Sequence, residues 1–376
     1  MKTVAESQVI KCVLFQQHWM VAGFAFFCVI FSASSCLEEH SKECQVLPRG
    51  LFNYTQLSRS PREIPGIFYV KVHKVGGSTF AGVVRAAGQR LGLRAACPRG
   101  NTLLSFDSNP DRNVSTVYAN HQMASASYCD LRTKRAFMLI TMLRHPVHRV
   151  RSLLDFRKIG RGLDVPIGEE GLRWYSSSNS ARCEQYNYIH PCPVKYQEFP
   201  CVSFSSILAS DSESRNRLTQ AVSQTLEGYD LVGVTEMFDE TVVVLSLMTG
   251  VSLGDLLYFS SKDSISTSTL NTAFISQFEK AYVVEYMLWK TAKTRLLRQI
   301  GSLTSQGEFK RLLLEYRRLN KLGRLWCETK WANKELLHLQ RGLWGDNGYG
   351  SLCLRHWYYT VHLGLQEIPY EAHPCA

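Results

Sequence analysis

Two short segments carry the residue types best suited to binding an anion. The first is His73-Lys74-Val75-Gly76-Gly77-Ser78-Thr79, which directly follows a β-rich apolar run. Its small residues let backbone amides approach anionic oxygens, the next helix adds a favourable dipole, and Ser78 and Thr79 add hydroxyl donors. A Walker A loop places its lysine after the glycines, whereas Lys74 precedes them. The segment predicts a phosphate-binding loop, with a plain structural turn as the alternative.

The second segment is Arg144-His145-Pro146-Val147-His148-Arg149-Val150-Arg151-Ser152. Arg144 ends a predicted strand, and Ser152 lies in the helix that follows. A guanidinium can bind a phosphate bidentately, and a hydroxyl can donate to the same group. Such a segment taken alone is often only a helix cap with solvated arginines. Together with the glycine loop, it predicts two phosphate sites on neighbouring strands of one sheet.

Alternating strands and helices are expected to position these two segments. Buried strands are predicted at residues 67–72, 137–143 and 229–235, and helices at 80–91, 147–156 and 237–248. This alternation predicts an α/β fold with a mostly parallel central sheet flanked by helices. Ligands bind such sheets at the carboxyl ends of the strands, which is where both segments lie.

The remaining chain is divided between an irregular part and a helical part. Residues 158–205 are rich in Gly, Ser, Tyr and Cys and predict a loop-rich insertion. Helical patterns dominate from Thr272 onward, so residues 300–376 are expected to form a helical, basic C-terminal part. Helical spacing is kept by Phe309, Leu312, Leu313, Tyr316 and Leu319, which lets Arg311, Arg317, Arg318 and Lys321 lie away from the core face.

Positive charge is concentrated near the C-terminus. The chain of 376 residues has a formal net charge of +11, and residues 289–341 hold thirteen Lys/Arg against four Asp/Glu. This stretch indicates an anionic partner, such as nucleic acid, an acidic lipid headgroup or a polyanionic glycan. Amphipathic helices with solvated basic faces are the open alternative.

The N-terminus predicts entry into the secretory pathway. Residues 19–31 form an unbroken apolar run that Ser and Ala extend to Cys36, with Lys2 and Lys11 before it and glutamates after it. That asymmetry predicts a cytosolic tail at 1–18, a signal anchor or cleaved signal peptide at 19–36, a stem at 37–62 and a lumenal domain at 63–376. The apolar run is shorter than the ~20 residues that usually span a membrane, so a signal anchor and a cleaved signal peptide both remain open.

Cysteines and sequons agree with a lumenal domain. Asn53-Tyr54-Thr55 and Asn113-Val114-Ser115 are candidate N-glycosylation sites in polar, turn-rich contexts. Of the 12 cysteines, none outside the apolar segment forms a CxxC pair, so a zinc ribbon or thioredoxin-like motif is disfavoured. Disulfides of unknown connectivity are therefore expected.

With these motifs in place, the sequence resembles a known family. The glycine loop and the Arg144–Ser152 segment look like the 5′-phosphosulfate loop and the 3′-phosphate motif of sulfotransferases that use 3′-phosphoadenosine 5′-phosphosulfate (PAPS). The similarity is greatest to the Golgi membrane-bound carbohydrate group, the galactose-3-O- and heparan/uronyl 2-O-sulfotransferases. Further matches are Ala119-Asn120-His121-Gln122 and the segments at 231–241 and 253–258, so the resemblance covers about residues 66–260.

The resemblance implies a P-loop-like sulfotransferase fold and a role for each motif. PAPS is the expected co-substrate, bound by Lys74, Gly76, Gly77, Ser78, Thr79, Arg144 and Ser152, with no metal. Sulfuryl transfer also needs charge neutralisation at the leaving phosphate, which suits Lys74, and a base for the acceptor proton, which suits His121. Glu236 is the second candidate for the base, or only orients a neighbour. Acceptor contacts are expected from Arg182, Gln185, Tyr186 and Glu236.

The implied function is transfer of a sulfuryl group to a hydroxyl of a glycan acceptor. The basic stretch at 289–341 is compatible with an anionic glycan. A type II Golgi membrane protein with a lumenal catalytic domain is the expected form. Two alternatives remain, a non-catalytic lumenal glycan-binding protein on the same scaffold and a tyrosylprotein sulfotransferase. A kinase or NTPase is disfavoured because the Walker lysine and a clear magnesium-binding carboxylate are missing, and nucleic acid is not an expected partner.

Overall fold

The computed structural model describes residues 64, 66–95, 116–119, 137–160, 166, 168–176, 185, 189, 212–259, 271–333, 335 and 352–365. All of them belong to one compact unit, Val46–Ala376. The predicted apolar segment at 19–36 and the stem at 37–62 lie outside these residues. Among the helices that the structure describes, none is both long and apolar enough to cross a membrane.

A parallel sheet forms the centre of this unit. Its strands are β1 (Gly66–Val70), β2 (Arg94–Ala95), β3 (Thr116–Tyr118), β4 (Met138–Leu143) and β5 (Leu231–Val234), in the order β2-β3-β1-β4-β5. Every neighbouring pair is parallel, and β2 is only a two-residue strand beside the four longer ones. The side chains of β1, β4 and β5 are buried throughout, as expected for a sheet covered on both faces. The predicted α/β fold with a mostly parallel sheet is confirmed.

The strand register brings the ends of the central strands together. Leu143, the last residue of β4, pairs with Val234, the last residue of β5. Arg144 and Thr235 therefore leave the sheet side by side. Because β1 lies directly beside β4, the loop that follows β1 leaves the sheet at the same edge.

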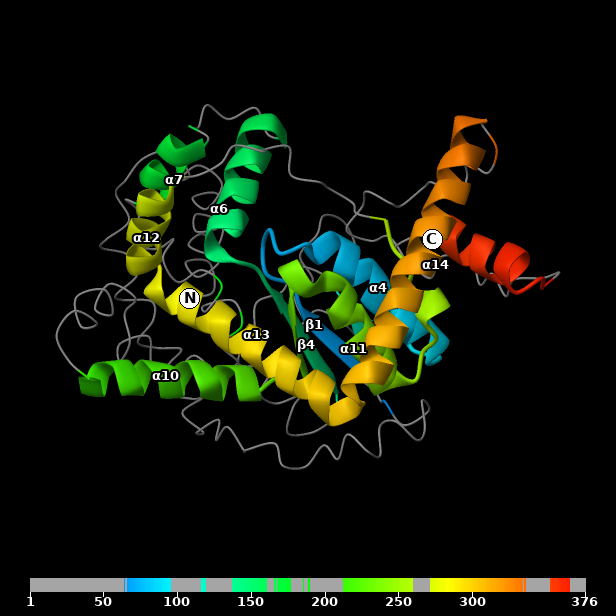
Figure 1. The fold of residues 1–376 in the computed structure, drawn as a ribbon, viewed down its shortest axis with the longest axis horizontal. Coiled ribbons are helices and arrows are strands. Elements are labelled where there is room, and N and C mark those ends of the chain that lie inside the picture. The colour runs from blue at the N-terminus through cyan, green and yellow to red at the C-terminus, as the bar shows by residue number, and fades with distance from the viewer. Residues whose placement is uncertain are drawn as a thin grey trace, which may run out of the picture. The chain divides into compact units, whose positions relative to one another are not determined.

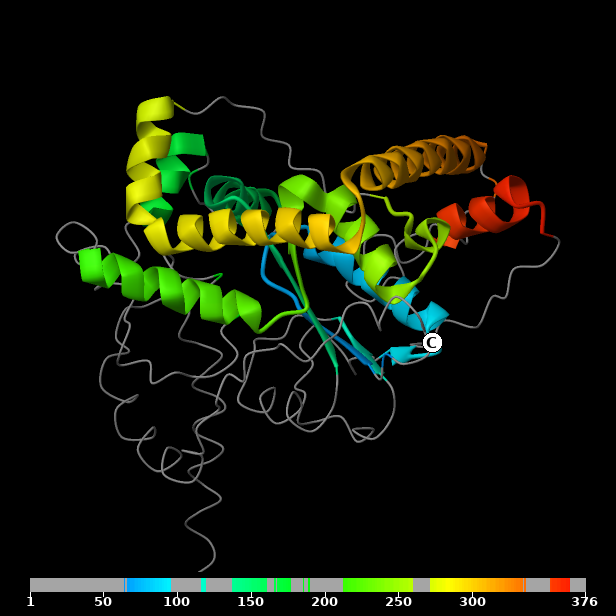
Figure 2. The same cartoon turned by 60° about the horizontal axis from the view of Figure 1, so that its bottom comes forward.

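Helices follow these strands as the sequence predicts. They are α4 (Gly77–Arg90) after β1, α6 (Pro146–Asp155) after β4 and α11 (Phe238–Thr249) after β5, with a π-helical turn at Phe156–Gly160 extending α6. α4 packs on β1 and β3, and α13 (Val283–Leu303) packs on β5. α13 also runs beside α10 (Ser212–Glu227), as Figures 1 and 2 both show. Helices thus enclose the sheet and leave the strand ends to hold the site.

Part of the expected loop-rich insertion is helical. α7 (Gly168–Ser176) packs against α6 and against α12 (Thr272–Ala281), and these three helices lie together in Figure 1. They share a second apolar cluster in which Leu154, Leu172 and Phe278 are buried. The sequence of α7 contains too few apolar residues to show helical spacing, so this helix could not be predicted from the sequence. Most of residues 158–205 lie outside the described part of the chain.

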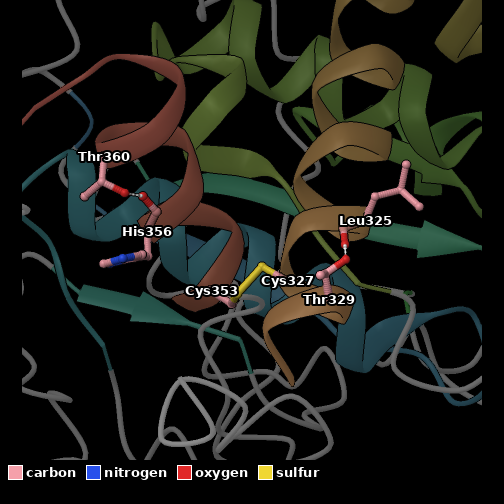
Figure 3. Close-up of a disulfide and its surroundings, with 6 residues drawn as sticks. All are labelled: Leu325, Cys327, Thr329, Cys353, His356 and Thr360. Carbon is pink, nitrogen blue, oxygen red and sulfur yellow. Dashed lines mark hydrogen bonds between the residues drawn. A yellow bond between two sulfur atoms is a disulfide. The ribbon is translucent and has the colours of Figure 1, made fainter. Parts of the chain in front are cut away.

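A disulfide joins the long C-terminal helix to the last helical segment. α14 (Gln306–Ala332) carries Cys327, and α15 (Leu352–His356) carries Cys353, with their α-carbons 6.0 Å apart (Figure 3). Both cysteines are fully buried. These are the two cysteines that the described residues contain, and a disulfide between them agrees with the expected use of cysteine.

The predicted faces of α14 are confirmed. Phe309, Tyr316 and Leu319 are buried, and the basic residues Arg311, Arg317, Arg318 and Lys321 are exposed. Much of that positive charge is paired, because Arg311 binds Glu308, Arg318 binds Glu315, and Arg317 binds both Asp239 and Glu240. A charge count along the chain overstates the field that this helix presents to a partner.

Candidate functional site

The loop between β1 and α4 has an unusual backbone. Lys74 has a φ of 65° and Gly76 a φ of 73°, so left-handed residues flank Val75. Glycine adopts this conformation freely, but for lysine it costs about 1–2 kcal/mol. Alternation of left- and right-handed residues turns successive backbone N–H groups toward one point, which is how protein loops form anion-binding nests. The strained lysine is the conformational feature that supports a binding role for this loop.

Close packing explains the second glycine. A β-carbon on Gly77 would lie 2.9 Å from Cγ of Lys71, a side chain that is only 1% exposed. Any larger residue would therefore push against the end of β1. Gly77 also opens α4, and its neighbours Ser78 and Thr79 occupy the first turn, with Ser78 half-buried and Thr79 buried.

Thr235 joins the ends of β4 and β5 to the loop after β1. Its hydroxyl oxygen lies 2.8 Å from the Val75 carbonyl oxygen and 3.1 Å from the Leu143 carbonyl oxygen, and the hydroxyl hydrogen bond is shared between them. One side chain at the end of β5 thereby holds both the loop after β1 and the end of β4. Thr235 lies in the segment 231–241, for which the resemblance implies no role of its own.

Arg144 connects the two predicted phosphate motifs directly. Its Nη1 donates a hydrogen bond to the Lys74 carbonyl oxygen at 3.2 Å. The side chain is half-buried, and burial lowers the pKa of Arg144 below its usual value. The guanidinium is thus held beside the glycine loop and not extended into solvent. Arg144 and Lys74 thus lie together at one edge of the sheet, at the ends of the neighbouring strands β1 and β4.

A buried polar network fixes the backbone of Arg144. The Gln185 side chain accepts from the Arg144 N–H at 3.1 Å and donates to the Arg144 carbonyl oxygen at 3.2 Å. Glu285 in turn accepts from the Gln185 side-chain amide at 2.6 Å and from its backbone N–H at 2.7 Å. Arg149 Nε lies 3.9 Å from a Glu285 oxygen, and both side chains are fully buried.

Gln185 has a role different from the one expected. Residue 185 is fully buried, and both ends of its amide are engaged by protein groups. We therefore assign it the positioning of Arg144 in place of the predicted acceptor contact. The network spans α6, α13 and the insertion, so it makes the geometry of the arginine depend on the packing of all three.

Glu236 holds the start of α6. One carboxylate oxygen accepts from the His145 N–H at 3.0 Å, and the other accepts from Trp289 Nε1 at 3.1 Å. A carboxylate with both oxygens engaged is suited to orientation more than to proton transfer. The observed contacts favour the orienting role, which the sequence left open beside that of a base.

An aromatic cluster surrounds His145. Its ring centroid lies 4.7 Å from that of Trp289 and 5.0 Å from those of Tyr286 and His148. Burial lowers the pKa of His145 to about 4, with a smaller contribution from His148, so the ring is neutral at pH 7. Its buried Nδ1 has no hydrogen-bond partner among the residues described.

Cationic and acidic groups meet at the end of α6. The Lys74 ammonium lies 4.3 Å from the centre of the Phe156 ring, and Ser152 is half-buried one turn before Asp155. Burial raises the pKa of Asp155, while Arg151, Lys74 and Arg144 act in the opposite direction. Its Oδ2 is buried without a hydrogen-bond partner in the described part of the chain. Asp155 therefore brings negative charge to the place where an anion is predicted to bind.

Several predicted site residues lie outside the described residues. These are His121, Arg182, Tyr186 and the sequon residues Asn53 and Asn113. The chain is described as far as Ala119, whose carbonyl oxygen accepts from Nη2 of buried Arg85 on α4 at 3.1 Å. This contact fixes the end of β3 two residues before His121.

The assembled site is an edge of a parallel α/β sheet, where a glycine loop strained at Lys74 meets an arginine that hydrogen bonds hold in place. No cluster of three metal-ligating side chains occurs among the residues that the structure describes. None of the known protein-family models matches the chain, and no curated protein matches it.

Four residues of the site were not assigned their roles from the sequence. Thr235, Asp155, Gln185 and Glu285 act through contacts with residues far away in the chain. Thr235 could have been singled out because it directly follows a buried strand. Asp155 could have been singled out because it lies three residues after Ser152, on the same face of the predicted helix. For Gln185 and Glu285 no local pattern exists, since they are 100 residues apart.

Proposed function

We propose that this chain is a PAPS-dependent sulfotransferase that transfers a sulfuryl group to a hydroxyl of a glycan. The observation that carries the proposal is the hydrogen bond from Arg144 Nη1 to the Lys74 carbonyl oxygen. It brings the two segments that resemble the phosphosulfate loop and the 3′-phosphate motif to one sheet edge. A P-loop-like sulfotransferase fold is the finer description of the observed α/β architecture that we propose.

The residues present fit a bisphosphorylated nucleotide. The left-handed residues Lys74 and Gly76 and the uncapped start of α4 suit one phosphate group, because loops of this kind and helix N-termini direct backbone N–H groups at an anion. Arg144 and Ser152 suit a second phosphate group, through guanidinium and hydroxyl donors. The Gln185–Glu285 network holds Arg144 in place, which reduces the conformational entropy lost on binding.

The chemistry divides among the residues of the chain. PAPS, when bound, supplies the activated sulfuryl group and an anionic leaving phosphate. The Lys74 ammonium neutralises charge that grows on the leaving side, which lowers the barrier because the group is already positioned. His121 takes the acceptor proton, as a histidine with a pKa near ~6.5 is able to do. Glu236 orients His145 and Trp289 and remains the second candidate for the base.

The cellular form that we propose is a type II Golgi membrane protein with this unit in the lumen. The apolar segment, the sequons and the Cys327–Cys353 disulfide all favour an oxidising compartment. This disulfide joins α14 to α15 and would stabilise a lumenal domain. In the cytosol it would be reduced.

Nucleotide binding is the first test. Calorimetry with 3′,5′-adenosine bisphosphate should show binding by the full chain and a roughly ten- to hundredfold loss for Arg144→Ala, since a charged hydrogen bond contributes about 1.5–3 kcal/mol. Arg298→Ala, an exposed arginine on α13, is the matched control and should bind as the wild type does. No binding by wild type, or equal binding by Arg144→Ala, would reject the proposal.

Transfer activity is the second test. The chain should move radiolabelled sulfate from PAPS to members of a glycan panel. Nucleotide binding without transfer to any glycan or tyrosine peptide would favour a non-catalytic glycan-binding protein. Transfer to a tyrosine peptide alone would identify a tyrosylprotein sulfotransferase.

A further inference from the structure

A pocket of about 370 Å³ lies against the exposed side of α14, and Arg144 is not among the residues that line it. Its size falls within the range of sites for small molecules. It is lined by Asp239, Tyr258, Arg317, Asn320, Lys321, Arg324, Leu325 and Glu328. None of these residues has a part in the nucleotide site proposed above.

Two aromatic rings connect this pocket with the glycine loop. A β-carbon on Gly76 would lie 3.6 Å from Cε2 of Phe238, so that ring covers the loop. The Phe238 and Tyr258 rings have centroids 4.6 Å apart, and Tyr258 forms one wall of the pocket. Asp239 follows Phe238 in the first turn of α11, which a short turn at Thr235–Met237 joins to β5. The pocket therefore adjoins the carboxyl edge of the sheet, where a group transferred from the loop would be received.

The polar wall of the pocket is organised before any ligand binds. Tyr258 donates its hydroxyl to Asp239 Oδ1 at 2.9 Å, and Arg317 Nε donates to Asp239 Oδ2 at 2.9 Å. Asn320, a buried residue of α14, accepts from the Tyr258 N–H at 3.0 Å. These bonds hold the tyrosine ring and the carboxylate in one geometry, which lowers the entropy lost when a ligand is captured.

Charge in the pocket is nearly balanced. Arg317 is bound by Asp239 and Glu240, and Lys321 and Arg324 share the wall with Glu328. A polyanion entering here would meet the carboxylates of Asp239 and Glu328. A neutral polyhydroxyl ligand would instead find both donors and acceptors beside an aromatic ring, and each hydroxyl can donate and accept.

We infer that this pocket binds the acceptor as a neutral pyranose residue whose hydroxyls are held by Asp239, Arg324 and Glu328. The term acceptor rests on the proposed sulfotransferase function, whereas the sugar site itself does not. The net charge of the chain allowed an anionic acceptor. The pocket instead favours a neutral one, because two carboxylates, Asp239 and Glu328, lie among its positive side chains.

A matched pair of sugars tests the inference. Methyl β-D-galactopyranoside and methyl β-D-galacturonide share one ring and differ by a carboxylate, and each is titrated by NMR into the full chain. The neutral sugar should bind more tightly. Arg324→Ala and Asp239→Asn should each weaken it about tenfold, as expected for loss of one hydrogen bond to a charged group. Lys310→Ala, exposed on the same helix and outside the pocket, should leave it unchanged.

Each alternative result has a definite meaning. If Lys321→Ala, Arg324→Ala and the Lys310→Ala control bind the galactoside with equal affinity, the sugar does not bind in this pocket. Lys321 is exposed, so its substitution is not expected to disturb folding. Tighter binding of the galacturonide overturns the neutral ligand class. No saturable binding of the galactoside, with or without 3′,5′-adenosine bisphosphate, overturns the sugar site.

Measuring nucleotide binding and sugar binding separately distinguishes this inference from the proposed function. Arg144→Ala should lose affinity for 3′,5′-adenosine bisphosphate and keep its affinity for the galactoside. Failure of the wild type to bind the nucleotide rejects the sulfotransferase while leaving a sugar site. In the transfer assay, Arg324→Ala should raise the acceptor KM about tenfold with kcat and nucleotide affinity unchanged.

Discussion

Arg144 donates a hydrogen bond from Nη1 to the carbonyl oxygen of Lys74, joining the end of β4 to the loop after β1. The two residues are 70 positions apart in the chain. Their contact places a fixed guanidinium beside a loop whose backbone is strained at Lys74, and so brings together the two segments that we propose bind phosphate groups. The predictions below test what the individual groups at this edge do.

Lys74 should separate stability from activity. Lys74→Gly and Lys74→Ala both remove the ammonium, so each should lower kcat about 10²–10³-fold with any acceptor, by comparison with loss of one oxyanion donor. Glycine also relieves the left-handed strain at φ 65°, so the glycine variant should be more stable than the alanine variant by about 1 kcal/mol. Urea unfolding and single-turnover kinetics measure the two effects. Normal kcat in both variants would mean that the loop has no catalytic role.

His121 should act on the acceptor proton alone. His121→Ala is expected to lower kcat about 10²–10⁴-fold and to flatten the acidic limb of the pH–rate profile, with little change in nucleotide affinity. A profile that keeps its acidic limb would exclude His121 as the base. Glu236→Gln would then be the next variant to measure, since it removes the carboxylate and keeps one of the two acceptor oxygens that His145 and Trp289 use.

Asp155 should oppose nucleotide binding. Asp155→Asn removes a negative charge that interacts with Lys74, Arg144 and Arg151, so 3′,5′-adenosine bisphosphate should bind several-fold more tightly at pH 7. Burial raises the pKa of Asp155, so in the wild type the carboxyl begins to be neutralised as the pH falls toward that raised value. Wild-type affinity should therefore rise on acidification more than that of Asp155→Asn. Calorimetry at several pH values measures both slopes, and parallel slopes would contradict the assignment.

His145 should make stability depend on pH. The pKa of His145 is about 4 in the folded chain and ~6.5 when unfolded, so the unfolded state binds more protons between these values. Stability is therefore lost as the pH falls from ~6.5 toward 4. After discounting for solvent screening, we expect wild type to lose about 1 kcal/mol more than His145→Gln between pH 7 and 5. Urea unfolding at the two pH values provides the measurement, and equal losses would contradict it.

Glu285 should be a strong contributor to stability. Glu285→Gln removes one charge of a fully buried ion pair with Arg149, and breaking such a pair typically costs about 3–5 kcal/mol. Glu315→Gln removes an exposed partner of Arg318 and should cost less than about 1 kcal/mol. Because Glu285 also holds Gln185, the first variant should weaken nucleotide binding through Arg144, and the control should not. Similar unfolding free energies for the two variants would rule out the buried network.

Local features were readable from the sequence. Buried strands at β1, β4 and β5 follow from short apolar runs, and each following helix begins where those runs give way to polar and small residues. Lys74 and Arg144 were found because a strand end followed by a glycine loop or by a proline is a local pattern. Such patterns are carried by neighbouring residues, so they need no knowledge of the fold.

Tertiary contacts decided the rest. Gln185 looks like a loop residue in the sequence, yet packing of the insertion against α6 and α13 buries it against Arg144 and Glu285. Basic residues of α14 look like a cationic face, yet α11 supplies Asp239 and Glu240 to neutralise Arg317. In each case the partner comes from a distant part of the chain. Residue type and local spacing determine which groups are available, whereas the strand register and helix packing determine which of them meet.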